Sequence, residues 1–275
     1  MGTRGFTEQN PLPQIFKAKK LGQRPGWLVA GKPKENKPAI SAQETEAVSR
    51  MISVIIPAHN EEHYLGRTLE ALHRQTYRWF EVLVIANGCA DRTAEVARGH
   101  CHRLIVLSQK SLGVARNLGA RMARGRVLVF LDADTLLDPG ALERVAAEFH
   151  PGYAAGTVRG VPDVGSFKYR LLYGLKNFVH RTSVHHGSSG VILCWKKHFM
   201  QTGGFDEGLE VRENSELIRR LLRFGKYKYL QGISATTSMR RYDQRGCRRM
   251  VWLWLKLWFH SLFGDLHHRK YEIIR

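Results

Sequence analysis

From residue 52 onward, short apolar runs alternate with stretches of helical periodicity. The runs at 52–56, 81–86 and 126–131 are apolar at nearly every position, as expected of strands that are buried on both faces. Helices placed between such strands form βα units, in which neighbouring strands lie parallel. The pattern therefore predicts an α/β fold with a mixed, mostly parallel sheet flanked by helices.

Helix ends are predicted from residue types that favour them. The candidate N-caps are Asn60, Asp91 and Asp138, the last followed by a first-turn proline. The helices that they open are expected at 61–74, 91–96 and 142–149. Further helices are expected at 114–124, 167–179 and 213–224, the last closed by Gly225, and shorter strands at 104–107 and 191–194.

Residues 1–50 differ in composition from the rest of the chain. They contain several prolines, scattered Lys and Arg, and little periodic apolar pattern. Such a segment buries too little surface to offset its ordering entropy, so a flexible basic extension without chemistry is expected. Because Met51 stands directly before the first strong strand, a start of translation at Met51 is an alternative. The predicted organisation is an extension at 1–50, a main domain at 51–240 and a C-terminal segment at 241–275.

The chain is strongly basic. Lys and Arg number 43 against 24 Asp and Glu, which gives a formal net charge of +19. This charge calls for an anionic partner, and nucleic acid, anionic lipid head groups or phosphate-bearing substrates all fit. The basic residues are spread over the chain and follow no nucleic-acid-reading motif, so no nucleic-acid partner is expected. A basic nucleic-acid-binding protein stays as an alternative function.

Cysteine usage and hydropathy restrict the location. The four cysteines form no CxxC pair and no zinc-ligand spacing, which favours a reducing compartment; they are Cys89, Cys101, Cys194 and Cys247. No secretory signal and no apolar run of membrane-spanning length is present in the sequence. A cytoplasmic protein, soluble or peripheral on the cytoplasmic face of a membrane, is expected.

An acidic pair follows the predicted strand at 126–131. Asp132 and Asp134, separated by Ala133, lie at the carboxyl end of that strand, where open α/β sheets usually bind their ligands. Two carboxylates one residue apart can hold one hard divalent cation, which can in turn hold a diphosphate. The alternative is that both side chains accept hydrogen bonds from turn amides.

Four further segments accompany this pair. They are Pro57-Ala58-His59-Asn60-Glu61-Glu62, Asn87-Gly88-Cys89-Ala90-Asp91, Gly113-Val114-Ala115-Arg116-Asn117 and Gly203-Gly204-Phe205-Asp206-Glu207. In this order, and with the acidic pair, they resemble the motifs of family 2 glycosyltransferases between residues 52 and 222. The resemblance implies the GT-A fold, a Rossmann-like nucleotide-diphospho-sugar transferase architecture, and hexosyltransferase activity.

The resemblance also implies roles for these residues. The segments 57–61 and 87–91 would surround the base and ribose of a nucleotide-diphosphate sugar donor, and 113–117 would approach the nucleotide, with Arg116 steadying it. Asp134, helped by Asp132, would hold Mn²⁺ or Mg²⁺ on the diphosphate. The structural alternatives are that Pro57 and Gly88 only shape turns, that Asn60 and Asp91 only cap helices, and that Arg116 pairs with a surface carboxylate.

Two positions depart from the family pattern. The second-strand turn has Ala86 and Asn87 where many members have two acids, which leaves the base of the donor open. The usual Glu-Asp pair is Glu213-Asn214 here, and Asn214 cannot accept a proton from the acceptor hydroxyl. Glu213 is the nearest substitute, with Asp206 and Glu216 behind it. An anionic polyprenyl-phosphate acceptor would need no base, and the alternative is that 213–214 only begin a helix.

The C-terminal run at 250–263 contains three tryptophans and two phenylalanines between basic clusters. Such a helix suits an anionic membrane surface, and the alternative is that it packs onto the domain. The acceptor, a glycan or a polyprenyl phosphate, should meet residues 162–189, which have no recognisable signature. A sugar nucleotidyltransferase and a non-catalytic relative are the remaining alternatives. A dehydrogenase and a phosphate-loop NTPase are disfavoured because their glycine motifs are missing.

Overall fold

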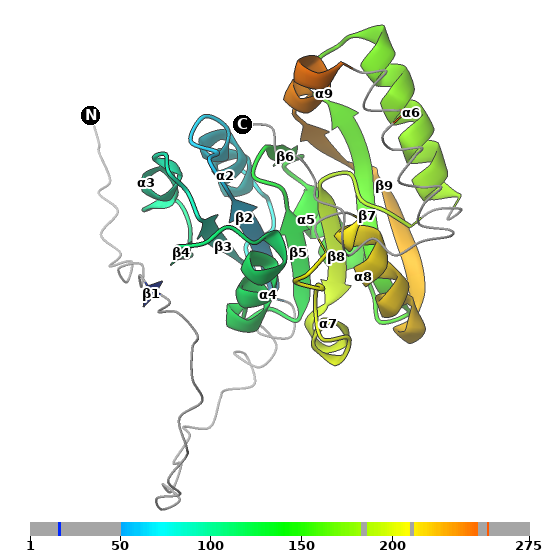
Figure 1. Cartoon of the computed structure of the whole chain (residues 1–275). Coiled ribbons are helices and arrows are strands. Elements are labelled where there is room, and N and C mark those ends of the chain that lie inside the picture. The colour runs from blue at the N-terminus through cyan, green and yellow to red at the C-terminus, as the bar shows by residue number, and fades with distance from the viewer. Residues whose placement is uncertain (1–15, 18–50, 183–185, 210–211, 247–251, 253–275) are drawn as a thin grey trace, which may run out of the picture.

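In the computed structural model, the residues described are 16–17, 51–182, 186–209, 212–246 and 252. Their strands form one sheet in the order β1-β4-β3-β2-β5-β8-β7-β9-β6 (Figure 1). The strands are β1 (Phe16–Lys17), β2 (Ile52–Ala58), β3 (Phe80–Asn87), β4 (Arg103–Leu107), β5 (Val127–Leu131), β6 (Thr135–Leu137), β7 (Tyr153–Pro162), β8 (Val191–Trp195) and β9 (Lys226–Thr237).

The first half of the sheet is parallel, as the apolar runs predict. β2 pairs in parallel with β3 and β5, and β3 pairs in parallel with β4. β8 then runs antiparallel to β5 and β7, β7 is parallel to β9, and β6 is antiparallel to β9. The sheet is therefore mixed and mostly parallel. β1 pairs with β4, and the rest of 1–50 lies outside the described residues.

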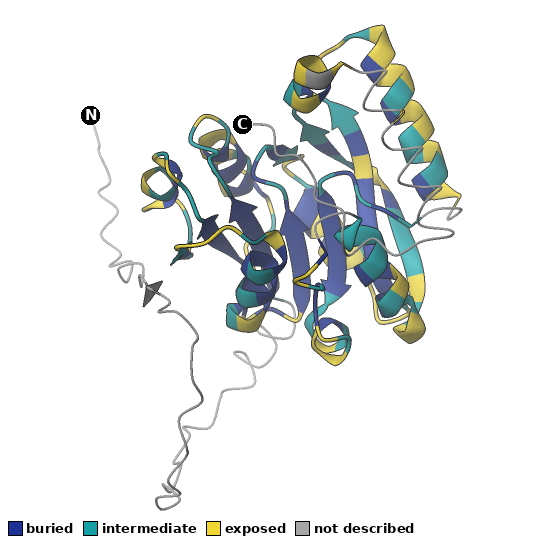
Figure 2. Cartoon of the chain, in the orientation of Figure 1, coloured by how far each residue is buried: buried dark blue, intermediate teal, exposed yellow. Residues whose placement is uncertain are grey.

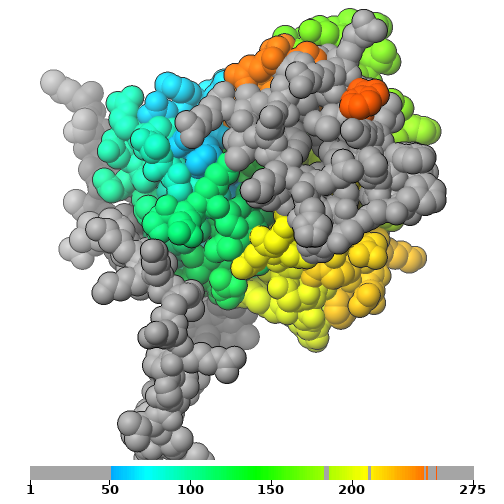
Figure 3. Space-filling model, viewed as in Figure 1, coloured from blue at the N-terminus to red at the C-terminus, as the bar shows by residue number. Residues whose placement is uncertain are grey.

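Helices cover both faces of this sheet (Figures 1 and 2). The described helices are α2 (Leu65–His73), α3 (Thr93–Ala97), α4 (Leu112–Met122), α5 (Ala141–Glu148), α6 (Phe167–Arg181), α7 (Lys196–Gln201), α8 (Glu213–Leu221) and α9 (Arg240–Arg245). Successive residues of β2 face opposite cores: Val54 and Ile56 pack with α2 and α5, and Ile55 packs with α4 and α8. In the space-filling view, α4 (green) and α7 with α8 (yellow) share one surface (Figure 3).

Two predicted N-caps are wrong. Asn60 has a left-handed backbone, with φ of 54°, and α2 begins at Leu65 after Tyr64. Its side chain instead accepts a hydrogen bond from the Ala90 amide. Asp138 does not cap α5 either, because its carboxylate accepts from the Ser234 amide. Gln75, from a distant turn, accepts from the Leu142 amide in the first turn of α5.

The remaining predicted elements agree more closely. The helix expected at 213–224 is α8 followed by a 3-10 turn at Leu222–Phe224, with Gly225 after it, and the helix at 167–179 is α6. The strands β6, β7 and β9 and the short helix α7 are additions to the sequence prediction. The run at 250–263 lies outside the described residues except for Trp252, whose side chain is exposed.

Candidate active site

Three parallel strands of the first half end at one edge of the sheet. β2 ends at Ala58, β3 at Asn87, and β5 at Leu131, directly before Asp132. In a parallel sheet these carboxyl ends leave a crevice beside the turns that follow them. The predicted site residues therefore gather at this edge because of the strand order.

The turn after β2 and the turn after β3 are joined by hydrogen bonds. The His59 ring Nδ1 donates to the carbonyl of Asn87 (2.8 Å), and the Glu62 amide donates to the Asp91 carboxylate (3.1 Å). Asp91 also accepts from the Thr93 amide at the start of α3 (3.0 Å). Burial raises the pKa of Asp91, but the hydrogen bonds from Thr93 and Glu62 outweigh it, and the pKa lies below its ordinary value. These bonds fix the shape of the loop pair.

Gly88 and Gly113 allow two close backbone approaches. Gly88 has φ of 64°, and a Cβ there would lie 2.7 Å from the amide nitrogen of Lys110. A Cβ on Gly113 would lie 3.0 Å from the Cα of Glu207. Asn87 accepts a hydrogen bond from the Ser111 amide just before α4. These two close approaches bring α4 and the residues just before it against the turn after β3 and against the turn at 203–207.

Asn117 is committed to the turn at 203–207. Its amide oxygen accepts from the Phe205 amide (2.8 Å), and its amide nitrogen donates to the Phe205 carbonyl (2.9 Å) and to Glu207 (2.9 Å). The side chain is buried. In this structure Asn117 holds the turn in place, and the nucleotide contact predicted for it stays a prediction.

Arg116 joins both halves of the domain. Its guanidinium is 4% exposed and donates to Asp132 (3.3 Å), Glu213 (3.1 Å) and Asn214 (2.9 Å). It also lies over the Phe205 ring, 4.9 Å from the centroid. A planar guanidinium can serve several acceptors at once, so one buried cation positions one acid of the β5 pair and the start of α8. The alternative that Arg116 pairs with a surface carboxylate agrees with the contact to Asp132, which is 42% exposed, whereas its other acid, Glu213, is 13% exposed.

The two acids after β5 have different surroundings. The Asp132 side chain is 42% exposed, and that of Asp134 is 9% exposed. Burial first, and the neighbouring Asp132 charge second, raise the pKa of Asp134 to about 6 against the opposing effect of Arg240. Between them, Ala133 is buried, and its carbonyl accepts from the Thr68 hydroxyl. The pair is therefore a close, partly buried concentration of negative charge.

Arg240 is the residue of this site that the sequence did not reveal. In the sequence it is one of several basic residues upstream of the C-terminal run. Its guanidinium, however, is only 17% exposed and lies between Asp134 (3.2 Å) and Glu61 (2.5 Å). It also stacks over the Tyr64 ring at 4.2 Å. Burial lowers the pKa of Arg240, but the Glu61 carboxylate outweighs it, and the pKa lies above its ordinary value. No local signal distinguishes Arg240 from the arginines around it.

The acidic pair fits a divalent cation that shares its ligands with a substrate. The described residues contain no group of three or more His, Cys, Asp or Glu placed to hold a metal, so the chain would supply two carboxylates. Mg²⁺ is commonly held by one or two carboxylates together with substrate phosphates and water. Arg240, 3.2 Å from Asp134, already places one positive charge beside this pair. Asp132 and Asp134 are the residues that would hold the ion.

The residues considered as a general base are placed unequally. Glu213 bonds to Arg116 beside Asp132, and Asn214 bridges Arg116 to the Ser188 hydroxyl. Asp206 accepts from the Gly208 amide in its own turn. Glu216 is held by Arg220 at 2.6 Å. Glu213 is therefore the carboxylate that the structure brings next to the acidic pair.

A model of the family "Glycosyl transferase family 2" matches residues 53–243, which is most of the chain and all of the geometry described above. The chain belongs to glycosyl transferase family 2. Its fold is the GT-A fold, as the sheet and the motifs at its edge predict.

Curated relatives agree with the membership of this family 2 chain. It is 26% identical over 213 residues to a chondroitin synthase of Escherichia coli, covering 70% of this chain and 30% of the synthase. It is 40% identical over 116 residues to a validoxylamine A glucosyltransferase of Streptomyces hygroscopicus subsp. limoneus, covering 39% of this chain and 25% of that enzyme. The chain thus spans less than a third of the length of these relatives.

Solved structures share the fold. TarS of S. aureus, solved in complex with UDP-GlcNAc, has a TM-score of 0.55 and 20% identity over 68% of this chain and 58% of that one. The mannosyltransferase PcManGT of Pyrobaculum calidifontis, solved with GDP-Man and Mn²⁺, has a TM-score of 0.55 and 18% identity over 67% of this chain and 56% of that one.

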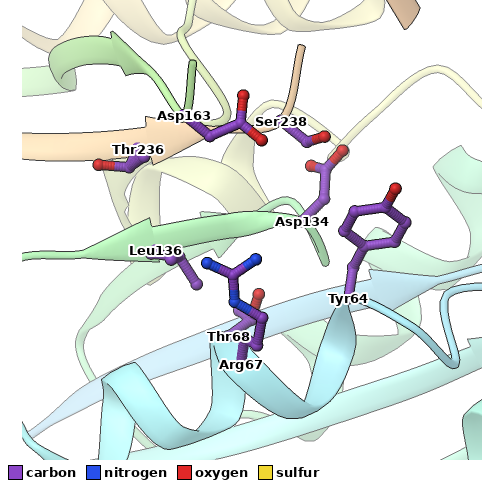
Figure 4. A pocket seen from close by; sticks show the side chains of 8 residues that line it. All are labelled: Tyr64, Arg67, Thr68, Asp134, Leu136, Asp163, Thr236 and Ser238. Atoms are coloured by element: carbon purple, nitrogen blue, oxygen red, sulfur yellow. The ribbon is translucent and has the colours of Figure 1, made fainter. Parts of the chain in front are cut away.

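A pocket of the family 2 domain is lined by Asp134 and by residues of α2, β6 and β9. Figure 4 shows Asp134 and Tyr64 at one end and Arg67, from α2, below the strand that carries Leu136. Asp163, at the end of β7, also lines it and accepts from the Met239 amide. The sequence did not predict this pocket, because its walls come from segments about 170 residues apart.

Proposed function

We propose that this chain is a metal-dependent, inverting glycosyltransferase that moves a sugar from a nucleotide-diphosphate donor to a lipid-linked or glycan acceptor. The observation that supports this most directly is the placement of Asp132 and Asp134 at the carboxyl end of β5, with Arg116 and Arg240 bound to them. Family membership supports the transfer of a sugar, and the residues gathered after β5 are those to which we assign it.

Donor binding is assigned to the first half of the domain. The turns at 57–61 and 87–91, held together by His59 and Asp91, would enclose the base and ribose. Arg116 holds Asp132 in place, so that the two acids present a fixed pair of carboxylates. A divalent cation bound there would neutralise the diphosphate as it leaves the sugar. Arg240 is positioned to add positive charge at the same place.

Acceptor activation is assigned to Glu213 when the acceptor is a hydroxyl. Glu213 is 13% exposed and is bound by Arg116, which also binds Asp132. Its carboxylate is therefore held in one orientation near the acidic pair. A carboxylate in that position can accept the proton of an attacking hydroxyl in a single displacement. A polyprenyl phosphate would attack as an anion and need no proton acceptor. Asn214 then acts through Ser188 and Arg116 as a positioning residue.

We further propose a peripheral, cytoplasmic location with residues 250–275 at an anionic membrane surface. Among the described residues, no helix is both long enough and apolar enough to cross a bilayer. The aromatic and basic composition of the C-terminal segment supports attachment at the interface.

A donor screen tests the proposed function. The full chain is heated with UDP, GDP, UDP-GlcNAc or GDP-Man, each with Mn²⁺ or with EDTA. A ligand that binds the native state raises Tm, and we expect one nucleotide to do so only with Mn²⁺. Release of nucleotide diphosphate from the matching sugar donor is then measured. Metal-dependent binding without release would indicate a non-catalytic relative, and the absence of any stabilisation would remove the proposed donor site.

A further inference from the structure

The outer face of α6 carries an uninterrupted apolar stripe. Phe167 is 79% exposed, Leu171 64%, Leu175 62% and Phe178 62%. These four residues, called here the α6 stripe, recur at helical spacing and so lie on one side of the helix. Ten large apolar side chains are exposed in the described residues, and five of them fall between Val164 and Phe178. Isolated exposed apolar residues are ordinary on soluble proteins, but a contiguous stripe marks a contact surface.

The stripe is not the face by which α6 packs on its own domain. Tyr169, Tyr173 and His180 are buried, and at helical spacing they project from the opposite side of the helix. On that side Asn177 bonds both the amide and the carbonyl of Gly160 in β7. α6 is therefore anchored through its inner face, and Figure 2 shows it at the margin of the domain.

The charges around the stripe are all of one sign. Residues 164–182 contain four Lys or Arg and no Asp or Glu. Lys168 borders the stripe on one side and Arg170 and Arg181 on the other, and all three are exposed. A partner that covers this face should therefore be apolar beneath and anionic at its surface.

The C-terminal segment does not have the charge of such a partner. Residues 247–275 contain six Lys or Arg and two Asp or Glu, so that segment is also basic. A second copy of α6 would bring the same positive charges against themselves. An anionic lipid bilayer has the complementary composition, since acyl chains accept the large apolar side chains and head groups meet the cations.

We propose that the α6 stripe docks the domain on an anionic membrane surface. α6 would lie in the plane of the interface, with the stripe among the lipids and the three cations at the head groups. The proposed site consists of residues of α6 and includes none of residues 250–275.

The helix that carries the stripe is connected to the candidate active site through its inner face. Tyr169 of α6 donates a hydrogen bond to Asp243 of α9, and Tyr173 packs in one cluster with Met239 and Tyr242. α9 begins with Arg240, which bonds Asp134. If the proposed function holds, docking would leave α6 and α9 between the acidic pair and the lipid surface that carries the acceptors. The docking itself does not depend on that function.

Flotation of the full chain with vesicles tests the proposal, without donor or metal. Vesicles of phosphatidylcholine alone are compared with vesicles that also contain phosphatidylglycerol. We expect the chain to float with the anionic vesicles, and the variant Leu171→Asp/Leu175→Asp to lose about tenfold or more in partitioning. The matched control Trp79→Asp/Met200→Asp changes two exposed apolar residues elsewhere and should float like the parent. Equal flotation of the parent and the stripe variant would overturn the proposal.

Two further measurements identify other occupants of the stripe. The stripe variant should melt only a few degrees below the parent, because its side chains contact water in the free protein and Asp merely has a lower helix propensity than Leu. A loss of about 3 kcal/mol or more, as for buried leucines, would mean that the chain itself covers the stripe, and a parent dimer that becomes a monomer in the variant would mean self-association. Either result overturns docking on lipid.

Arg170→Gln and Arg181→Gln should each weaken binding to anionic vesicles roughly fivefold. Unchanged binding would mean that these cations do not contribute to the docking.

Discussion

The first half of the sheet and the second half are stabilised in different ways. Every residue of β2 and β5 is buried, because helices cover both faces of these strands. β9 is twelve residues long, and only Leu230, Ile233 and Ala235 are buried in it. The first half is an apolar platform that presents turns and carboxylates at one edge. The second half contributes Arg240, which bonds Asp134, and Glu213 and Asn214, which bond Arg116 beside Asp132.

This contrast shows that the two halves contribute different kinds of interaction to the site. Fully buried parallel strands fix the backbone of the turns after β2 and β3. They also bring the two acids after β5 to the same edge of the sheet, close together. Elements of the second half, α8 and α9, bind those acids through Arg116 and Arg240. The turns after β2 and β3 are thus set mainly by the packing of the strands, and the acids after β5 are held by ion pairs, so the two should respond differently to mutation.

Asp134→Asn should give the largest change. We expect transfer to fall by about 10²–10³-fold, since the variant loses one of the two carboxylates proposed to hold the metal. The pKa of about 6 lies above the ordinary value of 3.8, so the carboxylate destabilises the fold progressively as the pH rises from about 4 to about 6, and fully above that. The variant should therefore melt about 2–4 °C higher at neutral pH.

Nucleotide release with Mn²⁺ and a thermal melt measure both effects. Glu95→Gln, an exposed acid on α3, is the control and should change neither. Full activity in Asp134→Asn would contradict its assignment to the metal.

Arg116→Met should destabilise the fold by about 3–5 kcal/mol, because it leaves Glu213 and Asp132 without their buried cation. Arg220→Met breaks the more exposed pair with Glu216 and should cost about 1 kcal/mol. Urea unfolding gives both values. Equal losses in the free energy of unfolding would mean that Arg116 contributes no more to the junction of the two halves than the more exposed Arg220 contributes to its own pair.

Glu213→Gln separates the two classes of acceptor. With a glycan acceptor, kcat should fall about a hundredfold, because the acceptor hydroxyl loses its proton acceptor. With a polyprenyl-phosphate acceptor, kcat should stay the same. Glu216→Gln, which alters an acid held by Arg220, serves as the control. Unchanged kcat with both acceptors would remove Glu213 from the role of base.

Arg240→Gln should give the smallest effect. Arg240 neutralises Asp134, so its removal should strengthen the attraction of Asp134 for another cation. We expect Mn²⁺ alone to bind about fivefold more tightly in calorimetry. Arg241→Gln, an exposed neighbour that acts on Asp134 more weakly, should give a smaller gain. Weaker Mn²⁺ binding in Arg240→Gln would show that the arginine does not compete with the ion.

The sequence predicted the first half well because its strands are long apolar runs and its turns follow them directly. The strands at 52–56, 81–86 and 126–131 were found within two residues of their ends, and they bring the turns after β2 and β3 and the acids after β5 to one edge. The predicted caps Asn60 and Asp138 failed because each side chain bonds a distant backbone amide. Local pattern does not contain such partners.

The second half was predicted less completely because its strands are partly exposed and mixed in polarity. β9 has few fully buried positions, so it produced no apolar run, and β6 is only three residues long. The helix at 167–179 was expected to be amphipathic. The structure shows apolar side chains on its outer face as well as buried aromatics on its inner face.

The sequence by itself determined the family, the parallel half of the sheet and the acids at its edge, because these depend on short-range apolar runs and on residues adjacent in the chain. Only the tertiary structure decided which charges meet. Arg116 and Glu213 are 97 residues apart, and Arg240 and Glu61 are 179 apart. Such ion pairs form because the sheet order brings distant segments together, and no local pattern in the chain specifies them.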